Sequence, residues 1–444
     1  MRNTTIRAVN RLTARWAEQA VTGKTGDTGG TGGTGDTSTV LTAVGVWPLL
    51  ALLADGAAGP AREELSEALG ISADSAAAAA RELLAGLSGV QGLRTATGLW
   101  ALQDLPLEQQ WLEALPDGAH GLLTGDPDTD AKSLDAWAAE HTGGLVERMP
   151  VDFPPPPAHT QLVLASALAQ RLRWIQPFRT GIVEPYEGPW AGRVLTALRR
   201  STTLLDRVRV AQTPAGPVTV LEVVGDGGVD VHLVLGAPGA PPGRVLSDGV
   251  GVVTRALPAT GASLLPEGNP GPGLRIGTVL SPDPEPYLHI QTTAFDVTAE
   301  HDLLDHPGLF GLTSASDTAA GHFPGISPRP LAVGSARQSA MARFDAEGFE
   351  AAAVTAVAAA AGAAAPTRFR YRTRQAEVCF DRPFGFLAVH RTSRLVLAAG
   401  WVTDPLPYEE REYPEYEEWQ KRAEEEAADA EWEAEQRAVA EQAQ

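Results

Sequence analysis

A run of small residues near the carboxyl end constrains the fold of this chain more than any other stretch. Residues 345–366 read DAEGFEAAAVTAVAAAAGAAAP, and no charged residue occurs between Glu350 and Arg368. Because alanine is the best helix former, one interpretation is an apolar helix, although the run has no polar stripe at helical spacing. Another is a low-complexity linker. The flanking residues favour a third interpretation.

These flanks supply a hinge, a loop and a strand in a fixed order. An acidic turn at 345–348 begins the run, VCFDRPFGFL follows it at 378–387, and GWVTDP ends the pattern at 400–405. This order resembles the serpins, in which a hinge of small residues leads into an exposed reactive loop and then into a strand opening F-x-R-P-F-x-F. The run is therefore interpreted as the hinge and reactive loop of a serpin-like chain.

Motifs elsewhere carry the same resemblance. They are ALLADGAAG at 51–59, SLDAWAAEHTGGLV at 133–146, LVLASALAQRLRWIQPF at 162–178 and FPGIS at 323–327. Asp135 stands where the family usually has asparagine. The resemblance covers about residues 4–405, but it is weak over 179–300, where the sequence predicts only strands and turns.

The resemblance implies an α+β fold. It should have a large mixed β-sheet, two further sheets, eight to nine helices and an exposed reactive loop. Residues 1–405 would form one serpin-like domain, with a flexible Gly/Thr-rich loop at 22–38 and the reactive-loop region at 345–376. Residues 406–444 would form an acidic, Ala/Glu-rich tail. The triplet at 23–25 reads GKT, but a phosphate-binding loop needs a glycine where Glu18 stands.

Composition limits the partners and the compartment. The net charge of -20 argues against nucleic acid, and residues 407–444 carry half of it, with 14 acids and 4 bases. The single cysteine, Cys379, excludes an intramolecular disulfide. No signal peptide or 18-residue apolar run is evident, so we expect a cytoplasmic monomer with no membrane association. Abundant Ala, Gly and Arg, with three lysines, suggests a GC-rich bacterial genome.

Enzyme motifs are missing from the sequence. There is no G-x-S-x-G, S-x-x-K or H-E-x-x-H pattern and no cysteine cluster, so neither catalysis nor a cofactor is expected. The segment HDLLDH at 301–306 could be interpreted as a set of metal ligands, with His301 and Asp305 on one helical face. Nothing upstream supplies further ligands. A solvated helix end is the favoured interpretation, and no metal is expected.

The resemblance implies a serine protease inhibitor that acts as a suicide substrate. A protease cuts the loop, the cut loop inserts into the central sheet as a new strand, and the acylated protease is trapped. The inserting hinge must lack proline, because every residue donates an N–H to the ladder. It comprises Gly348, Phe349, Glu350, Ala351, Ala352, Ala353, Val354 and Thr355. On the family pattern, the inward-facing positions are Phe349, Ala351, Ala353 and Thr355, three of which are small enough to pack easily.

Several residues depart from the pattern of inhibitory serpins. Phe349 replaces a threonine or serine, and a ring at the first inserting position is expected to slow insertion. The implied sheet-opening region comprises Gly45, Ser166, Trp174 and Gln338. Gly45, Ser166 and Gln338 replace a serine, an asparagine and a histidine that hydrogen-bond beneath the sheet. These departures support the alternative of a non-inhibitory serpin-fold protein that binds a partner or ligand.

The position of the cut has two candidates. Counting about 15 residues from the hinge glycine gives the bond between Gly362 and Ala363, which would suit subtilisin- or elastase-like proteases. Counting back from the following strand leads to about Arg372, and this residue or Arg368 would suit trypsin-like proteases. Arginines at 368–374 also alternate with other residues, as on the solvated face of a strand. The first candidate is preferred, because a late cut would insert a longer strand.

Overall fold

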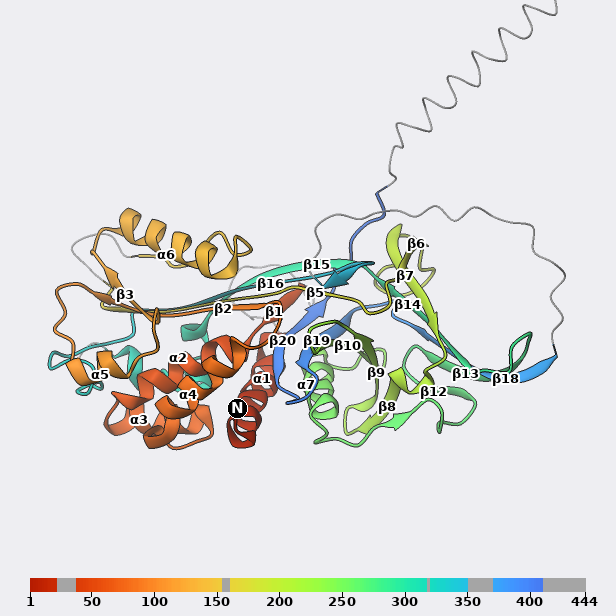
Figure 1. Cartoon of the computed structure of the whole chain (residues 1–444), viewed down its shortest axis with the longest axis horizontal. Helices are drawn as coiled ribbons and strands as arrows, with labels where there is room; N and C mark the ends of the chain where they lie inside the picture. The colour runs from red at the N-terminus through yellow and green to blue at the C-terminus, as the bar shows by residue number, and fades with distance from the viewer. Residues whose placement is uncertain (22–36, 154–159, 318–319, 350–369, 410–444) are drawn as a thin grey trace, which may run out of the picture. The chain divides into compact units, whose positions relative to one another are not determined.

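The computed structural model describes residues 1–21, 37–153, 160–317, 320–349 and 370–409. Residues Met1–Leu406 form one compact unit, and Pro407–Gln444 form a second. Among the described residues of the first unit, three sheets and eight α-helices occur (Figure 1). The expected α+β class, with one large mixed sheet and two further sheets, is confirmed. No described helix has both the length and the apolar composition needed to cross a membrane.

The central sheet is mixed. Its long strands, in spatial order, are β3 (His120–Leu123), β2 (Leu93–Leu102), β4 (Leu162–Gln170), β16 (Ser335–Phe344) and β15 (Phe295–Asp302). Two short strands, β17 (Gly348–Phe349) and β5 (Leu172–Arg173), lie beyond the end of the β4–β16 pair. Strands β4 and β16 are parallel and pair over six residues, Ser335–Ala340 with Val163–Leu168. This parallel pair is the place where a further strand could enter antiparallel to both.

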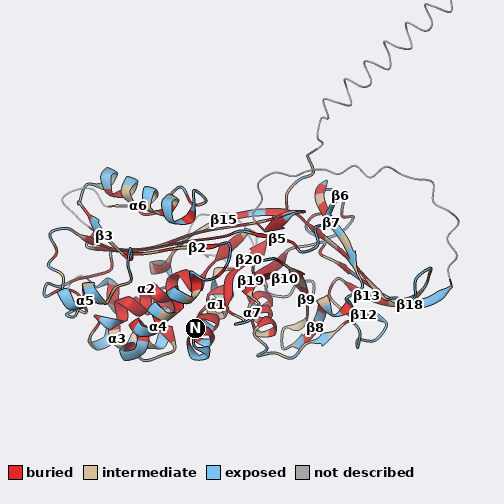
Figure 2. Cartoon of the chain, viewed as in Figure 1, coloured by how far each residue is buried: buried red, intermediate tan, exposed pale blue. Residues whose placement is uncertain are grey.

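Both faces of the central sheet are covered, which explains why β4 is an unbroken apolar run. Its even-numbered leucines pack in the main core, whereas Val163, Ala165 and Ala167 pack against Leu134 and Ala138 of α6 (Pro127–Thr142). Helix α6 lies on one face, and α2 (Ala43–Asp55) lies on the other (Figure 1). Helix α2 is apolar all round, as expected for a helix in the core, and residues 43–54 are all buried (Figure 2).

Six further α-helices lie in the described part of the chain, and some begin and end at recognisable sequence signals. They are α1 (Asn3–Ala20), α3 (Gly59–Leu69), α4 (Ala73–Leu87), α5 (Gln109–Ala114), α7 (Pro242–Val253) and α8 (Pro307–Phe310). Proline stands in the first turn of α3, and the helix ends at Gly70 with φ of 68°, the left-handed conformation that glycine adopts without strain. In α6, the Asp126 side chain accepts a hydrogen bond from the Thr129 N–H at 2.9 Å, which satisfies one unpaired donor.

The second sheet is antiparallel throughout. Its strands, in order, are β1 (Thr39–Leu41), β20 (Val396–Val402), β19 (Phe384–His390), β10 (Val229–Gly236), β9 (Gly216–Val224), β8 (Val208–Thr213) and β11 (Thr260–Gly261). The strand expected from the motif at 378–387 is therefore β19, which lies in the centre of this sheet next to the chain's last strand. All residues of β10 and β20 are buried.

A third sheet receives the chain after the small-residue run. Its order is β12 (Gly268–Gly271), β13 (Leu274–Ser281), β18 (Tyr371–Cys379), β14 (Tyr287–Thr293), β7 (Leu195–Thr202) and β6 (Arg179–Val183). Strand β18 lies between two partners, since it pairs antiparallel with β13 over eight residues and parallel with β14 over five. The sequence predicted strands in 179–300 but did not predict that β13 would flank β18.

One local prediction was wrong. His301 was expected at a solvated helix end, but it lies in strand β15, opposite Gln338 of β16. A 3-10 turn, η2 (Leu303–Asp305), follows the strand, and the short helix α8 begins only at Pro307. The period of two in residues 295–299, with Phe295 and Val297 buried and Asp296 and Thr298 exposed, is the strand signal that the helix interpretation overlooked.

Candidate functional site

The acidic turn after β16 reverses the chain and begins the candidate hinge. The Asp345 Oδ1 atom accepts hydrogen bonds from the N–H groups of Glu347 at 2.8 Å and Gly348 at 3.0 Å, and the Asp345 N–H donates to the Gly348 carbonyl at 3.0 Å. An aspartate that accepts from backbone two and three residues onward stabilises a tight turn. The turn therefore sends residues 348–349 back alongside β16.

Gly348 and Phe349 form β17, which is inserted between β16 and β5. Phe349 pairs with Phe344 on one side and with Leu172 on the other, and Gly348 pairs with Arg173. A Cβ at position 348 would lie 2.3 Å from the Leu172 carbonyl oxygen. Position 348 thus requires glycine because the backbone of β5 approaches it closely.

The Phe349 ring is buried, with 2% of the residue exposed. It lies 6.1 Å from the ring of Phe386 in β19, and its strand partner Phe344 lies 4.8 Å from Trp174 and 5.3 Å from Phe295, centroid to centroid. The sequence suggested that this ring would slow entry into the sheet. In the structure, the ring already occupies the sheet while the chain is intact, so its entry is not a barrier that remains to be crossed.

Trp174 holds the acidic turn against the body. Its indole Nε1–H donates to the Asp345 carbonyl at 2.9 Å, and its backbone N–H donates to the Glu347 carbonyl at 2.9 Å. The Phe178 N–H donates to the Ala346 carbonyl at 2.8 Å. Because Trp174 is itself buried, these contacts fix the turn at the end of the central sheet where β17 lies.

Three predicted sheet-opening residues meet beneath the β4–β16 pair. Ser166 and Gln338 are opposite each other in the two strands, and a Cβ at Gly45 in α2 would lie 2.3 Å from the Ser166 Oγ atom. The Gln338 amide makes two hydrogen bonds with the Thr42 backbone, accepting from its N–H at 2.9 Å and donating to its carbonyl at 2.8 Å. Gln338 therefore ties β16 to the start of α2.

Ser166 lacks a comparable tie. Its Oγ atom is buried and has no hydrogen-bond partner in the described part of the chain. Leaving a buried hydroxyl unpaired costs about 1–3 kcal/mol, so this position is a weak point in the closed sheet. The sequence indicated that the region differs from the family pattern but did not reveal the role of Thr42, since a backbone partner leaves no trace in residue identity.

At the other end of the small-residue run, β18 begins earlier than the predicted loop boundary. The reactive-loop region was expected to reach residue 376, but Arg372 pairs with Leu280 of β13. Arg374 donates to the carbonyls of Ala262, at 3.0 Å from Nη2, and Leu265. Arg372 therefore lies in a hydrogen-bonded ladder, which favours the interpretation of the arginines as strand residues and not as protease sites.

The remaining predicted site residues lie outside the described residues. They are Glu350, Ala351, Ala352, Ala353, Val354, Thr355, Gly362, Ala363 and Arg368. The same holds for most of the Gly/Thr-rich loop at 22–38 and of the tail at 406–444. The described hinge therefore consists of its first two residues and the body that surrounds them.

Other candidate chemical groups are engaged structurally. Burial raises the pKa of the Cys379 thiol to about 11, so it is protonated and unreactive at neutral pH. The His301 Nε2 atom lies 2.8 Å from the Val40 carbonyl oxygen, and the ring packs on the edge of Trp16 at 5.1 Å. Within the described ranges, no group of three or more His, Cys, Asp or Glu side chains is arranged to hold a metal ion.

Comparison with known proteins places this geometry in a family. The family model described as serpin (serine protease inhibitor) matches residues 33–186 and 285–405, more than half of the chain. An uncharacterized serpin-like protein of Pyrobaculum aerophilum is 25% identical over 368 residues, which span 82% of this chain and 87% of that protein.

Solved structures show the same fold. Human thyroxine-binding globulin in complex with thyroxine has a TM-score of 0.66 at 17% identity and covers 91% of this chain and 98% of its own. Serpin48, a highly specific serpin of the insect Tenebrio molitor, has a TM-score of 0.64 at 19% identity and covers 90% of this chain and 98% of its own. Residues 187–284, which include β13, lie outside the matched family segments. The chain belongs to the serpin family of serine protease inhibitors.

Proposed function

We propose that this protein inhibits serine proteases as a suicide substrate. The loop that follows β17 is cut, and its amino-terminal part then inserts between β4 and β16 while the acylated protease remains attached. The single observation that carries the proposal is β17 itself, because Gly348 and Phe349 are already paired between β16 and β5. Insertion then extends a strand that exists and needs no new nucleus.

The register of β17 supports this proposal. Phe349 is opposite Phe344 of β16 and Leu172 of β5. If the inserting strand kept this register, a residue two positions after 349 would lie opposite residues two positions before 344 and before 172. Residue 353 would lie between Ala340 and Leu168, and residue 355 would lie between Gln338 and Ser166. The two latter residues now face each other, and the arriving Thr355 hydroxyl would be a partner for the Ser166 hydroxyl.

The same register predicts which side chains enter the core. Side chains two apart share a face of a strand, so positions 351, 353 and 355 would point the same way as the buried Phe349. These positions hold alanine, alanine and threonine, which cost little in a close-packed interior. The opening step breaks six β4–β16 pairs, and the new strand then restores hydrogen bonds on both of its edges.

The position of β18 bears on which protease is trapped. Since Arg372 is paired within the third sheet, we favour the bond between Gly362 and Ala363, with subtilisin- or elastase-like proteases as targets. Arg368, as a trypsin-like site, is the alternative. From residue 349 to residue 362 the inserted strand would span about 45 Å, far enough to carry a protease away from the loop's starting position. We further propose that the protein acts as a monomer in the cytoplasm.

The test is whether a covalent complex forms. Mixing the protein with subtilisin- and elastase-like enzymes should give a complex that survives SDS. Ala353→Arg should abolish the complex while leaving cleavage intact, because it places a charge on the inward face. Ala352→Arg is the matched control, since its side chain would point to the opposite face of the sheet, away from the main core, and it should preserve the complex. Cleavage of the unaltered protein without any complex would reject inhibition.

A second candidate function is a non-inhibitory serpin-fold protein that binds a partner or ligand. It is favoured by the Gln338–Thr42 hydrogen bonds, which tie β16 to the start of α2 and so stabilise the closed sheet. This alternative predicts cleavage of the loop with neither a complex nor any gain in thermal stability. The complex-formation assay therefore separates the two functions.

A further inference from the structure

A surface cavity, open to solvent and lined by no hinge residue, lies between the third and second sheets. Its volume is about 440 Å³. Nine residues line it, from the segment before β8, from β8 and β9, and from two loops: Thr203, Leu204, Leu205, Asp206, Arg207, Arg209, Glu222, Ser263 and Pro286. Eight of the nine belong to the segment 187–284 that the family model leaves unmatched. The cavity is therefore built mainly from residues outside the matched family segments.

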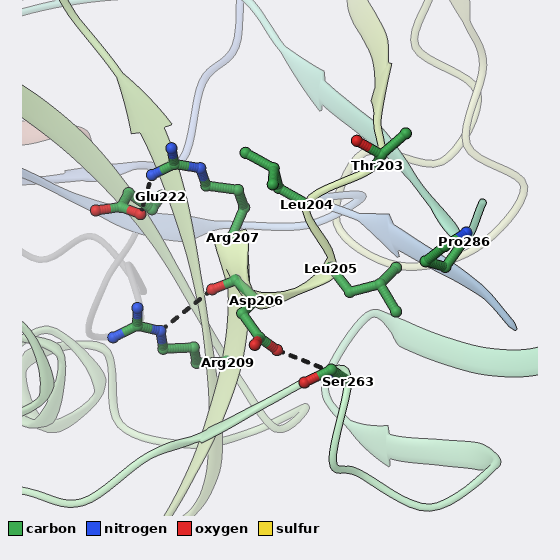
Figure 3. Close-up of a pocket in the computed structure, with 9 residues that line it drawn as sticks. All are labelled: Thr203, Leu204, Leu205, Asp206, Arg207, Arg209, Glu222, Ser263 and Pro286. Atoms are coloured by element: carbon green, nitrogen blue, oxygen red, sulfur yellow. Dashed lines mark hydrogen bonds and ion pairs between the residues drawn. The ribbon is translucent and has the colours of Figure 1, made fainter.

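One side of the cavity is apolar. Figure 3 shows Leu205 and Pro286 on one side of Asp206 and Arg209 on the other, with Leu204 and Arg207 above it. Leu204 is 55% exposed, so its side chain is accessible to a ligand in the cavity. A cavity of this size with an aliphatic side and a few polar groups is typical of small-molecule sites.

The cationic side is only partly neutralised by the protein. Arg207 forms an ion pair with Glu222. Arg209 donates its Nε–H to the backbone carbonyl of Asp206 at 3.2 Å and has no carboxylate partner among the described residues. One Asp206 carboxylate oxygen accepts from the Ser263 N–H at 3.0 Å, so this carboxylate holds the neighbouring loop in place.

A third arginine adds positive charge nearby. The Arg200 guanidinium donates to the Gln176 carbonyl at 2.6 Å and lies 4.4 Å above the Phe178 ring, again without a described carboxylate partner. Burial, followed by the charge of Arg207, lowers the pKa of Arg200 to about 10. The cavity lining itself therefore has two arginines and two carboxylates, with Arg200 as a further positive charge close to Arg207.

We propose that this cavity binds a small organic anion with an apolar body, such as an aromatic carboxylate. The carboxylate would pair with the Arg209 guanidinium, and the ring would pack against Leu204, Leu205 and Pro286. Charge-assisted hydrogen bonds from arginine to carboxylates are among the strongest polar contacts that proteins make. The site is independent of the hinge, so it holds whether or not the protein inhibits proteases.

The experiment compares an anion with its neutral analogue. We expect 2-naphthoate to bind the full-length protein with one-to-one stoichiometry by calorimetry, and 2-naphthamide, which lacks the charge, to bind about tenfold more weakly. Added salt should weaken the binding of naphthoate but not that of the amide. Failure of naphthoate to bind, or equal affinity for the two compounds, would overturn the proposal.

Two variants locate the site. Arg209→Gln should weaken naphthoate binding about tenfold and leave naphthamide unchanged, and Leu204→Asp should weaken both compounds. Both positions are exposed, so the fold should be retained, and an unchanged melting midpoint checks this. Arg275→Gln is the matched control, because Arg275 is an exposed arginine on β13 outside the cavity. Naphthoate binding that survives both cavity variants would place the ligand elsewhere and refute the proposed site.

Discussion

The chain between residues 349 and 371 is tied to the body by two residues at its amino end and by a whole strand at its carboxyl end. Strand β17, the amino anchor, contributes one residue pair with β16 and two with β5. Strand β18, the carboxyl anchor, pairs over eight residues with β13 and five with β14, and Arg374 adds contacts to two carbonyls. Strand β17 could lengthen by adding residue pairs. Strand β18 could be released only by breaking its hydrogen bonds with both β13 and β14.

In the proposed mechanism, this difference gives loop insertion a direction. After a cut, the amino-terminal piece would extend β17 between β16 and β4, while the carboxyl-terminal piece would stay on the third sheet. Without a cut, β18 retains the far end, so an intact chain can add only a limited number of pairs. Strand β13, which lies in the segment unmatched by the family model, therefore restrains uncut insertion in our proposed mechanism.

Cleavage of the loop should produce the largest effect. If about ten further residues pair on both edges, with a net gain of about 1 kcal/mol each, the free energy of unfolding should rise on the order of 10 kcal/mol. Differential scanning calorimetry before and after limited subtilisin digestion measures the change. A midpoint that does not rise after cleavage would mean that the amino anchor cannot lengthen.

Removing the ring of the amino anchor should have the next largest effect. Phe349→Thr should lower the free energy of unfolding by about 3 kcal/mol, because the ring is almost completely buried. Tyr371→Thr at the start of β18 is the matched control, since Tyr371 is 43% exposed, and should change stability by less than about 0.5 kcal/mol. Urea unfolding measures both.

The same variant tests the role of the ring in inhibition. Because the ring lies in the sheet before any cut, Phe349→Thr should leave the rate of complex formation nearly unchanged. A several-fold faster reaction would show that the ring does retard insertion, as its departure from the family pattern suggested. The equilibrium and kinetic measurements therefore address different steps.

Much of the body could be predicted from sequence because its signals are local. The apolar run at 162–168, the proline at the start of α3 and the motifs around β19 each encode one element. The hinge glycine could also be located, since small residues follow it. The sequence did not show that Phe349 is already buried, because that burial depends on Phe344 and Leu172, and on Trp174 holding the turn.

The carboxyl anchor escaped prediction for a similar reason. Arg372 could be interpreted as a loop or a strand residue, and only its pairing with Leu280 decides. The residues of β13 come from a segment where the family resemblance is weak, so neither a motif nor periodicity indicated which strand they would meet. Strand pairing across about 90 residues is set by tertiary packing, which no local pattern records.

A single methyl group should weaken the amino anchor by a smaller amount. Gly348→Ala would place its Cβ 2.3 Å from the Leu172 carbonyl oxygen, which should separate β17 from β5 at a cost of about 1–3 kcal/mol. Hydrogen exchange at residues 344–349 should accelerate, and Trp174 fluorescence should change. Gly277→Ala, in β13, is the matched control on the carboxyl anchor, where no atom lies within 4 Å of the added Cβ. Slow exchange in both variants would show that β5 does not hold the hinge.

Acid should weaken the strand against which the amino anchor lies, with the smallest effect. His301 is opposite Gln338 of β16, and burial lowers its pKa, with the nearby His306 acting in the same direction and the hydrogen bond to Val40 opposing it. His301 lines a small cavity, and three acidic side chains line it too: Glu300, Asp302 and Asp305. In the unfolded chain the His301 imidazole takes up a proton as the pH falls below about 6.5, whereas in the folded protein it does so only at lower pH. The free energy of unfolding should therefore decrease as the pH is lowered below about 6.5.

Comparison with a variant isolates this contribution. His232 in β10 titrates in the same direction, since burial lowers its pKa to about 4, and it remains in both proteins. His301→Gln should therefore reduce the slope of stability against pH below 6.5 without removing it, as measured by urea unfolding at several pH values. An equal slope in the unaltered protein and in His301→Gln would mean that β15 holds the protonated ring as well as the neutral one, and that acid does not act through this strand.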